Sequence, residues 1–225
     1  MPADDGVRWD VLKSDIRSFA RRLPGIVSND PSAVALVVAN VFAIVNLWMR
    51  GEPVTSILVV YWIQMMILGF WHAVRIAVVS RWKALFFVPI FLIMYLAIIN
   101  IFGILVGSLI DDQMQGTAWH DGFSLWNYWM TAAVFFANHG FSFYFNFIRS
   151  REYETTSWED QLRKPMLRAM PMWLASIIGG FAAGLLGWPA LIVVVVMPVK
   201  LVLDLIGHLV EHGKLTFEDL PEEMR

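Results

Sequence analysis

The chain has 225 residues, of which 58% are hydrophobic and only 16% are charged. A soluble domain of this length normally carries about 25% charged residues, so the composition indicates a membrane protein. The net charge of -2 gives no support for a nucleic-acid partner. The sequence contains no cysteine, which excludes disulfides, iron–sulfur clusters, thiolate zinc sites and covalently attached haem.

The first thirty residues predict an amphipathic helix over residues 8–23. Apolar side chains recur there at steps of three or four residues: Trp9, Leu12, Ile16, Phe19 and Leu23. Such a helix can lie in the headgroup region with its arginines and lysine near anionic lipid headgroups, and docking onto a cytoplasmic partner is the alternative. Pro24 and Gly25 are expected to end it. Its many charges are not those of a cleavable signal peptide.

Six apolar stretches follow, separated by short polar or charged segments. They lie near residues 31–49, 54–73, 84–108, 125–148, 167–186 and 189–210. Each approaches the roughly 20 residues that a helix needs to cross a hydrocarbon core about 30 Å thick. The predicted fold class is therefore all-α: a polytopic transmembrane helical bundle of about six spans with an N-terminal amphipathic interfacial helix.

Lysine and arginine alternate between the connections, and this pattern predicts the orientation. The 74–83 and 149–166 connections and the N-terminal segment are basic, whereas the 109–124 and 187–188 connections contain neither residue and the 50–53 turn has only Arg50. Because basic connections stay on the cytoplasmic side, we expect a multi-pass protein of the cell (inner) membrane with both termini in the cytoplasm. The expected parts are a cytoplasmic segment, a six-span domain and a cytoplasmic tail, at residues 1–30, 31–212 and 213–225.

Ionisable residues are costly in hydrocarbon, so those inside the spans indicate a candidate site. In the last span Lys200, Asp204, His208 and His212 are four residues apart and share one helix face. Lys200 and Asp204 can pair there, and Asn40 of the first span lies at a similar depth. The predicted ion, proton or substrate site consists of Lys200, Asp204, His139, Gln64 and Asn138.

A metal site on the same face is a second hypothesis. Histidines at i and i+4 can share a cation, and the ligand set would be His208, His212, Asp204 and His72. The zinc-binding string His-Glu-x-x-His is absent, since the chain reads His208-Leu-Val-Glu211-His212. No cofactor is firmly predicted: a divalent metal fits these residues, and haem held by His72 and His208 is disfavoured because two histidines at one depth are a common coincidence.

Other catalytic motifs are missing from the sequence. It contains no phosphate-binding glycine loop, no dinucleotide fingerprint and no Gly-x-Ser-x-Gly nucleophile turn. The serines considered have no paired base that the sequence makes visible: Ser56, Ser108, Ser142 and Ser176. The sequence therefore gives a serine hydrolase no support.

Three short strings stand in the second, fourth and sixth apolar stretches: Tyr61-Trp62-Ile63-Gln64, His139-Gly140 with neighbouring phenylalanines, and Lys200-x3-Asp204-x3-His208. Together they resemble an uncharacterised family of prokaryotic multi-span membrane proteins, a domain of unknown function. The resemblance covers roughly residues 31–212. It implies a helical inner-membrane protein and supplies no activity, so no catalytic role is transferred.

Three functions fit these observations. A small transporter or proton- or ion-coupled carrier is favoured, because Lys200 and Asp204 lie near the membrane centre, where carriers bind their substrates. A membrane-embedded, metal-dependent enzyme would instead use His208 and His212 near the cytoplasmic interface. A scaffold or accessory subunit of a membrane complex would use the polar residues only for packing. The expected partners are the lipid bilayer, anionic headgroups at the N-terminal helix, and a second copy or a membrane complex.

Overall fold

The computed structural model describes residues 5–50, 56–113, 128–186 and 197–216. Helices make up nearly all of these residues, and no strand occurs among them, which confirms the all-α prediction for this part of the chain. The α-helices are α1 (Asp5–Ser28), α2 (Pro31–Met49), α3 (Ser56–Ser80), α4 (Ala84–Gln113), α5 (Trp129–Ser142), α6 (Trp158–Leu185) and α7 (Met197–Glu211). The shorter helical turns are η1 (Arg81–Lys83), η3 (Phe143–Arg149) and η4 (Glu152–Glu154).

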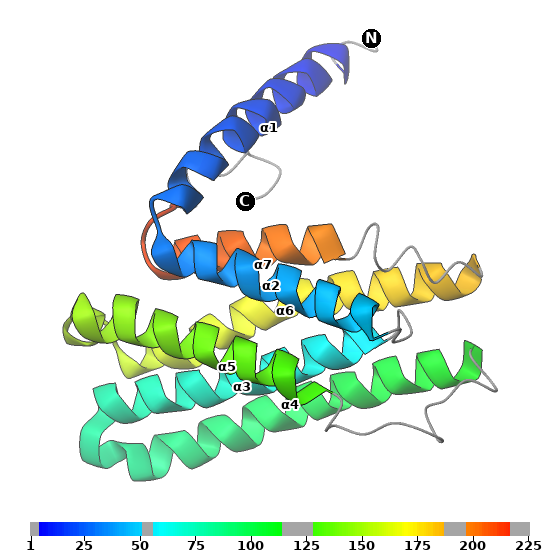
Figure 1. The fold of residues 1–225 in the computed structure, drawn as a ribbon. Helices are drawn as coiled ribbons and strands as arrows, with labels where there is room; N and C mark the ends of the chain where they lie inside the picture. Colours follow the sequence, from blue (N-terminus) through cyan, green and yellow to red (C-terminus); the bar gives the residue numbers. More distant parts are fainter. Residues whose placement is uncertain (1–4, 51–55, 114–127, 187–196, 217–225) are drawn as a thin grey trace.

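Helices α2 to α7 lie alongside one another as a bundle, and α1 projects from one end of it (Figure 1). Helix α2 packs against α5 and α7, whereas α3 packs against α4, α5 and α6. The turns η1, η3 and η4 lie at the same end of the bundle as the last turn of α7 and the start of α2 (Figure 1). We call this the η end.

Helix α1 continues through Pro24 to Ser28, so the expectation that Pro24 and Gly25 end it was wrong. A proline inside a helix removes one backbone hydrogen bond, but tertiary packing decides most helical stability. Here Leu23, Ile26 and Val27 pack with Phe19 against apolar side chains of α2 and α7, which holds the last turn in place. The arginines at positions 17, 21 and 22 are exposed.

Helices α3 and α4 form an antiparallel hairpin through η1 (Figure 1). The chain reverses at Arg81, whose φ is 52°. The Tyr95 hydroxyl donates to the Met65 carbonyl oxygen at 3.0 Å, and a Cβ atom at Gly69 would collide with the Tyr95 ring. Helix α3 reaches Ser80, seven residues beyond the predicted 54–73 stretch, because its last two turns still pack on neighbouring helices.

Two helical segments of the described residues are long and apolar enough to cross a membrane: Pro31–Met49 and Ser56–Ile101. The first is α2. The second has 46 residues and contains both arms of the α3–α4 hairpin, so it turns back on itself within the bundle. By length and composition alone, these are the segments of the described residues that could cross a membrane.

The second half differs from the sequence prediction in its boundaries. Residues 125–127 of the predicted 125–148 stretch lie outside the described residues, and the rest contains α5 followed by η3, a seven-residue π-helix. Helix α6 starts at Trp158, nine residues before the predicted 167. The predicted turn at 187–188 and the start of the 189–210 stretch lie outside the described residues, as does most of the 213–225 tail.

Candidate functional site

Lys200 of α7 lies at the centre of a polar cluster inside the bundle. Its Nζ atom is 2.5 Å from Asp204 Oδ2, and it donates to Asn40 Oδ1 and Gln64 Oε1, both at 2.6 Å. Gln64 also donates through Nε2 to Asp204 Oδ2 at 3.1 Å. We call these four residues the core cluster. It joins α2, α3 and α7 at one level of the bundle.

The core cluster is closed to solvent. Lys200 and Asp204 are each 1% exposed, and Asn40 and Gln64 are also buried. The Lys200 ammonium group further lies 4.8 Å from the centroid of the Tyr61 ring and 5.7 Å from that of Phe135. An ammonium group has three N–H donors, and the three oxygen acceptors together with two aromatic faces replace its hydration. Each N–H of the Lys200 ammonium group can thus meet an oxygen acceptor.

Three of the five residues predicted for this site are therefore together: Lys200, Asp204 and Gln64. Asn138 and His139 are buried on α5, about one helical turn after Phe135. Asn40 and Gln64 accept hydrogen bonds from Lys200, and Gln64 donates one to Asp204. Gly140 has a packing role, since a Cβ atom there would lie 2.8 Å from Trp71 Cζ2.

A second polar network begins one turn further along α7, at His208. Asp30 is the N-cap of α2 and accepts hydrogen bonds from the Ser32 backbone N–H at 3.0 Å and from the Ser32 hydroxyl at 2.6 Å. His208 Nε2 lies 2.8 Å from Ser32 Oγ. Because the single hydroxyl proton of Ser32 points to Asp30, His208 Nε2 must carry the hydrogen of that contact. The start of α2 is thus tied to the end of α7.

His212, the last predicted member of this face, bridges α5 and η4. Its Nδ1 atom lies 3.1 Å from Glu152 Oε2, and its Nε2 atom lies 3.3 Å from Ser142 Oγ. Asn146 donates through Nδ2 to Ser32 Oγ at 2.8 Å and to Ser142 Oγ at 3.3 Å. Asn146 therefore connects the His208 and His212 contacts into one network, which we call the η-end network.

Two lysines neutralise the acidic members of this network. Lys214 Nζ is 2.8 Å from Asp30 Oδ2 and donates to Asn146 Oδ1 at 3.4 Å. Lys164 of α6 donates to Glu152 Oε1 at 2.9 Å. The network consequently combines residues of α2, α5, η3, η4, α6 and the end of α7.

Both carboxylates of the η-end network are held in the ionised form. Burial by itself raises the pKa of Asp30, but its contacts with His208, Lys214 and Ser32 outweigh burial and hold that pKa well below its ordinary value of 3.8. Burial also raises the pKa of Glu152, and its contacts with His212 and Lys164 bring the net pKa below the ordinary 4.5. Each carboxylate is stabilised by the cationic or donor groups that face it.

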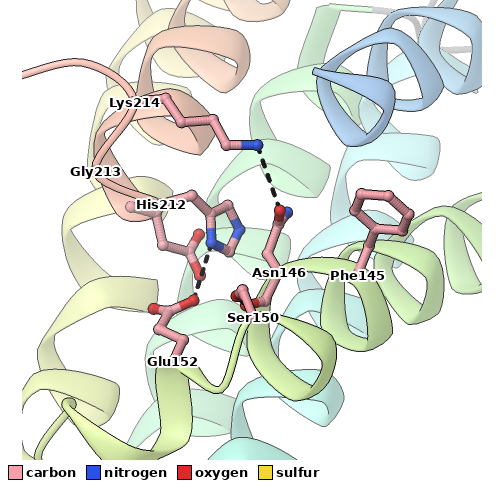
Figure 2. Close-up of a pocket in the computed structure, with 8 residues that line it drawn as sticks. Phe145, Asn146, Ser150, Glu152, His212, Gly213 and Lys214 are labelled. Carbon is pink, nitrogen blue, oxygen red and sulfur yellow. Dashed lines mark hydrogen bonds and ion pairs between the residues drawn. The ribbon is translucent and has the colours of Figure 1, made fainter. Parts of the chain in front are cut away.

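An open pocket of about 540 Å³ lies against this network at the η end. Figure 2 shows His212, Glu152, Asn146 and Lys214 around it, with the ring of Phe145 set apart from His212 and Glu152. The full lining is Phe145, Asn146, Ser150, Glu152, Glu211, His212, Gly213 and Lys214. The polar groups of the lining are thus an imidazole, an amide, a hydroxyl, an ammonium group and two carboxylates.

The four residues predicted as metal ligands have separate partners. Asp204 pairs with Lys200, His208 Nε2 lies 3.6 Å from Asp30 Oδ2, and His212 contacts Glu152. His72 Nε2 lies 3.8 Å from Glu211 Oε1, and Arg75 forms an ion pair with the same carboxylate. Within the described residues, no group of three or more histidine, aspartate or glutamate side chains is arranged to hold a metal ion.

Sequence reasoning missed most of the η-end network. The sequence shows no base beside Ser142 and leaves a pairing in space open; in the structure His212, 70 positions away, lies against Ser142. Sequence reasoning also omitted Asp30, Asn146 and Glu152. Only Asp30 had a local signal: the string Asp30-Pro31-Ser32 has an N-cap residue before a proline at the first helical position.

A family model matches residues 22–217 of the chain, and the family is described as a family of unknown function, DUF6498. The chain belongs to this family. The matched range contains every residue of the core cluster and of the η-end network, so both belong to the DUF6498 region of the chain. No curated protein and no solved structure matches the chain.

Proposed function

We propose that this DUF6498 protein is a multi-span inner-membrane protein in which α2 to α7 cross the bilayer, with the η end on the cytoplasmic side. Large apolar side chains exposed on the outside of the bundle support this, because a soluble surface rarely carries so many. They include Val38, Trp48, Leu85, Phe86, Ile93, Ile101, Ile104 and Ile178. The basic residues of η1 and of the segment after η3 lie at the η end, in agreement with the positive-inside rule.

Within this bundle, the core cluster is proposed to be the proton or small-cation site of a small coupled carrier. The observation that carries the proposal is Asp204, whose second oxygen, Oδ1, is buried and has no hydrogen-bond partner among the described residues. An ionised oxygen without a donor is poorly stabilised in a buried site. Binding a proton or a cation at Oδ1 removes that cost, so Asp204 is the group on which charge would change.

The η-end network supplies a route between the core cluster and the pocket. His208 follows Asp204 by one turn on the same face of α7, and residues at this spacing are neighbours. From His208 the contacts continue through Ser32 and Asp30 to Lys214, which lines the pocket. Chains of buried ionisable residues that lead from one face toward the membrane centre are typical of proton pathways.

Flux measurements in proteoliposomes test the carrier. A pH or cation gradient is imposed across vesicles containing the purified protein, and a dye in the lumen reports ion movement. We expect flux with the unaltered protein and background flux with Asp204→Asn. The matched control is Asp160→Asn, which removes an exposed carboxylate of α6. The carrier proposal fails if the unaltered protein moves no proton or cation, or if Asp204→Asn moves as much.

A further inference from the structure

The two ring nitrogens of His212 contact different kinds of side chain. Ser142 Oγ faces Nε2 at 3.3 Å, and Glu152 Oε2 faces Nδ1 at 3.1 Å. A serine hydroxyl on one nitrogen and a carboxylate on the other is the arrangement by which a histidine activates a serine nucleophile. Ser142 ends α5, Glu152 begins η4 and His212 follows α7, so the three come from separate parts of the chain.

The hydrogen-bond chemistry fixes the tautomer of His212. An ionised carboxylate only accepts hydrogen bonds, and the pKa of Glu152 lies below its ordinary value, so Nδ1 carries the hydrogen. In neutral His212 the lone pair is then on Nε2, directed at Ser142. Lys164, 2.9 Å from the other Glu152 oxygen, holds the carboxylate in this orientation. His212 can therefore act as a general base toward Ser142.

The ring of His212 has other charged and titratable neighbours besides Glu152. The ring of His208 lies 4.8 Å away, centroid to centroid, and Lys214 and Glu211 line the same pocket. Lys214 is held by Asp30, and Glu211 is held by Arg75. Glu152 is the carboxylate that contacts His212 Nδ1. This contact orients the imidazole ring so that Nε2 faces Ser142, as a general base requires.

We propose that Ser142, His212 and Glu152 form a nucleophile site that hydrolyses carboxylic esters. His212 and Glu152 line the η-end pocket, as does Asn146, whereas Ser142 is buried and contacts His212 and Asn146. An ester that enters the pocket would reach Ser142 past these two side chains. Ser142 Oγ bonds to the ester carbonyl carbon while its proton moves to His212 Nε2. The tetrahedral adduct then collapses, the bond to the alcohol oxygen breaks, and His212 gives that oxygen the proton. Water attacks the acyl-serine by the same route, which releases the carboxylic acid and returns the proton to Ser142. Glu152 is a positioning residue throughout.

The pocket indicates how the ester would be held. The Asn146 amide nitrogen is 3.3 Å from Ser142 Oγ, close enough for its N–H to stabilise the oxyanion that forms beside Ser142. Lys214 lies next to Asn146 and adds a positive charge. The ring of Phe145 supplies an apolar surface away from His212 (Figure 2). This favours esters with an apolar acyl group.

The nucleophile is tested by covalent labelling of the full chain in detergent. A fluorophosphonate probe should attach to Ser142, as read by peptide mass spectrometry, and p-nitrophenyl butyrate should be hydrolysed. Ser142→Ala should lose both signals, and His212→Asn should lower the hydrolysis rate by about 100-fold or more. Ser28→Ala is the matched control, because Ser28 is an exposed hydroxyl at the end of α1 and does not line the pocket. A folded protein that takes no probe at Ser142 overturns the proposal, and so does Ser142→Ala that still hydrolyses the ester.

A second measurement needs no ester and no catalysis. The chain has no cysteine, so Ser142→Cys introduces a single thiol beside His212. The thiolate is the reactive form, and we expect its alkylation by iodoacetamide at pH 7 to fall by about tenfold when His212→Asn is added. The same addition should leave Ser150→Cys unchanged. Equal rates for Ser142→Cys with and without His212 would show that the two side chains are only packed together, which contradicts the proposal.

The hydrolase and the carrier fail separately. Asp204→Asn should abolish flux and leave labelling of Ser142 unchanged, because Asp204 is not part of the nucleophile site. Ser142→Ala should abolish labelling and leave flux unchanged. Loss of labelling in Asp204→Asn, in protein that still unfolds cooperatively, would contradict the independence of the two sites.

Discussion

The ammonium group of Lys200 has three N–H donors, and each meets an oxygen of the core cluster. Lys200→Met would leave Asp204 buried without its partner, and removing one member of a buried ion pair typically costs about 3–5 kcal/mol. We expect a loss of stability of that size, measured as the unfolding transition in detergent. Lys200→Met combined with Asp204→Leu should recover most of it, because replacing both charges avoids the unpaired carboxylate. If Lys200→Met alone and Lys200→Met with Asp204→Leu lose the same stability, the loss does not come from an unpaired Asp204 carboxylate, and the prediction is contradicted.

Individual residues also show where sequence reasoning succeeds. Lys200, Asp204 and Gln64 were predicted together because a four-residue spacing fixes two of them on one helix face, and depth in the span places the third. The contacts of His212 follow no such rule. Ser142 and Glu152 are 70 and 60 positions away from it, and only the packing of three segments at the η end brings them to its ring. Spacing along one helix is visible in a sequence, whereas contacts between helices depend on their crossing and register.

At the scale of elements, the N-terminus of α2 is fixed by Asp30, which caps the helix and contacts His208 and Lys214 from the end of α7. The folded pKa of Asp30 lies below the ordinary 3.8. A lowered pKa means that Asp30 contributes stability that is fully present above about pH 4 and is lost as the pH falls through the folded pKa. We therefore expect the unfolding temperature of the unaltered protein to fall below pH 4 more steeply than that of Asp30→Asn. Glu154→Gln, at an exposed carboxylate of η4, should retain the slope, and an equal slope in Asp30→Asn would contradict the assignment.

Element boundaries were the least predictable part of the fold. Pro24 has the local chemistry of a helix end, yet α1 passes through it because the residues around it pack against α2 and α7. The π-helix η3 likewise has no signal in the apolar pattern of residues 125–148. It turns Asn146 and Phe147 into the bundle, and Asn146 then joins Ser32, Ser142 and Lys214. The π-helix η3, which the sequence pattern does not predict, thus carries Asn146, the residue that connects the His208 contacts with the His212 contacts.

For the whole molecule, the proposal that the bundle crosses a bilayer carries an expected orientation. The apolar outer surface and the basic η end lead us to expect the η end on the cytoplasmic side, where arginine and lysine of membrane proteins collect. The same orientation would open the η-end pocket to the cytoplasm, next to the headgroups. The proposed carrier needs the two ends of the bundle on opposite sides of the membrane, whereas for the proposed hydrolase the orientation decides only from which side esters would enter.

Single cysteines test this orientation directly, because the chain contains none of its own. Trp82→Cys in η1 and Arg149→Cys at the end of η3 are at the η end, whereas Arg50→Cys follows α2 at the opposite end (Figure 1). In intact cells, a maleimide that cannot cross the membrane should label Arg50→Cys only, and all three should react after the cells are opened. Labelling of Trp82→Cys or Arg149→Cys from outside would invert the orientation. Labelling of all three in intact cells would mean that the bundle does not separate two compartments, and the carrier could then not operate.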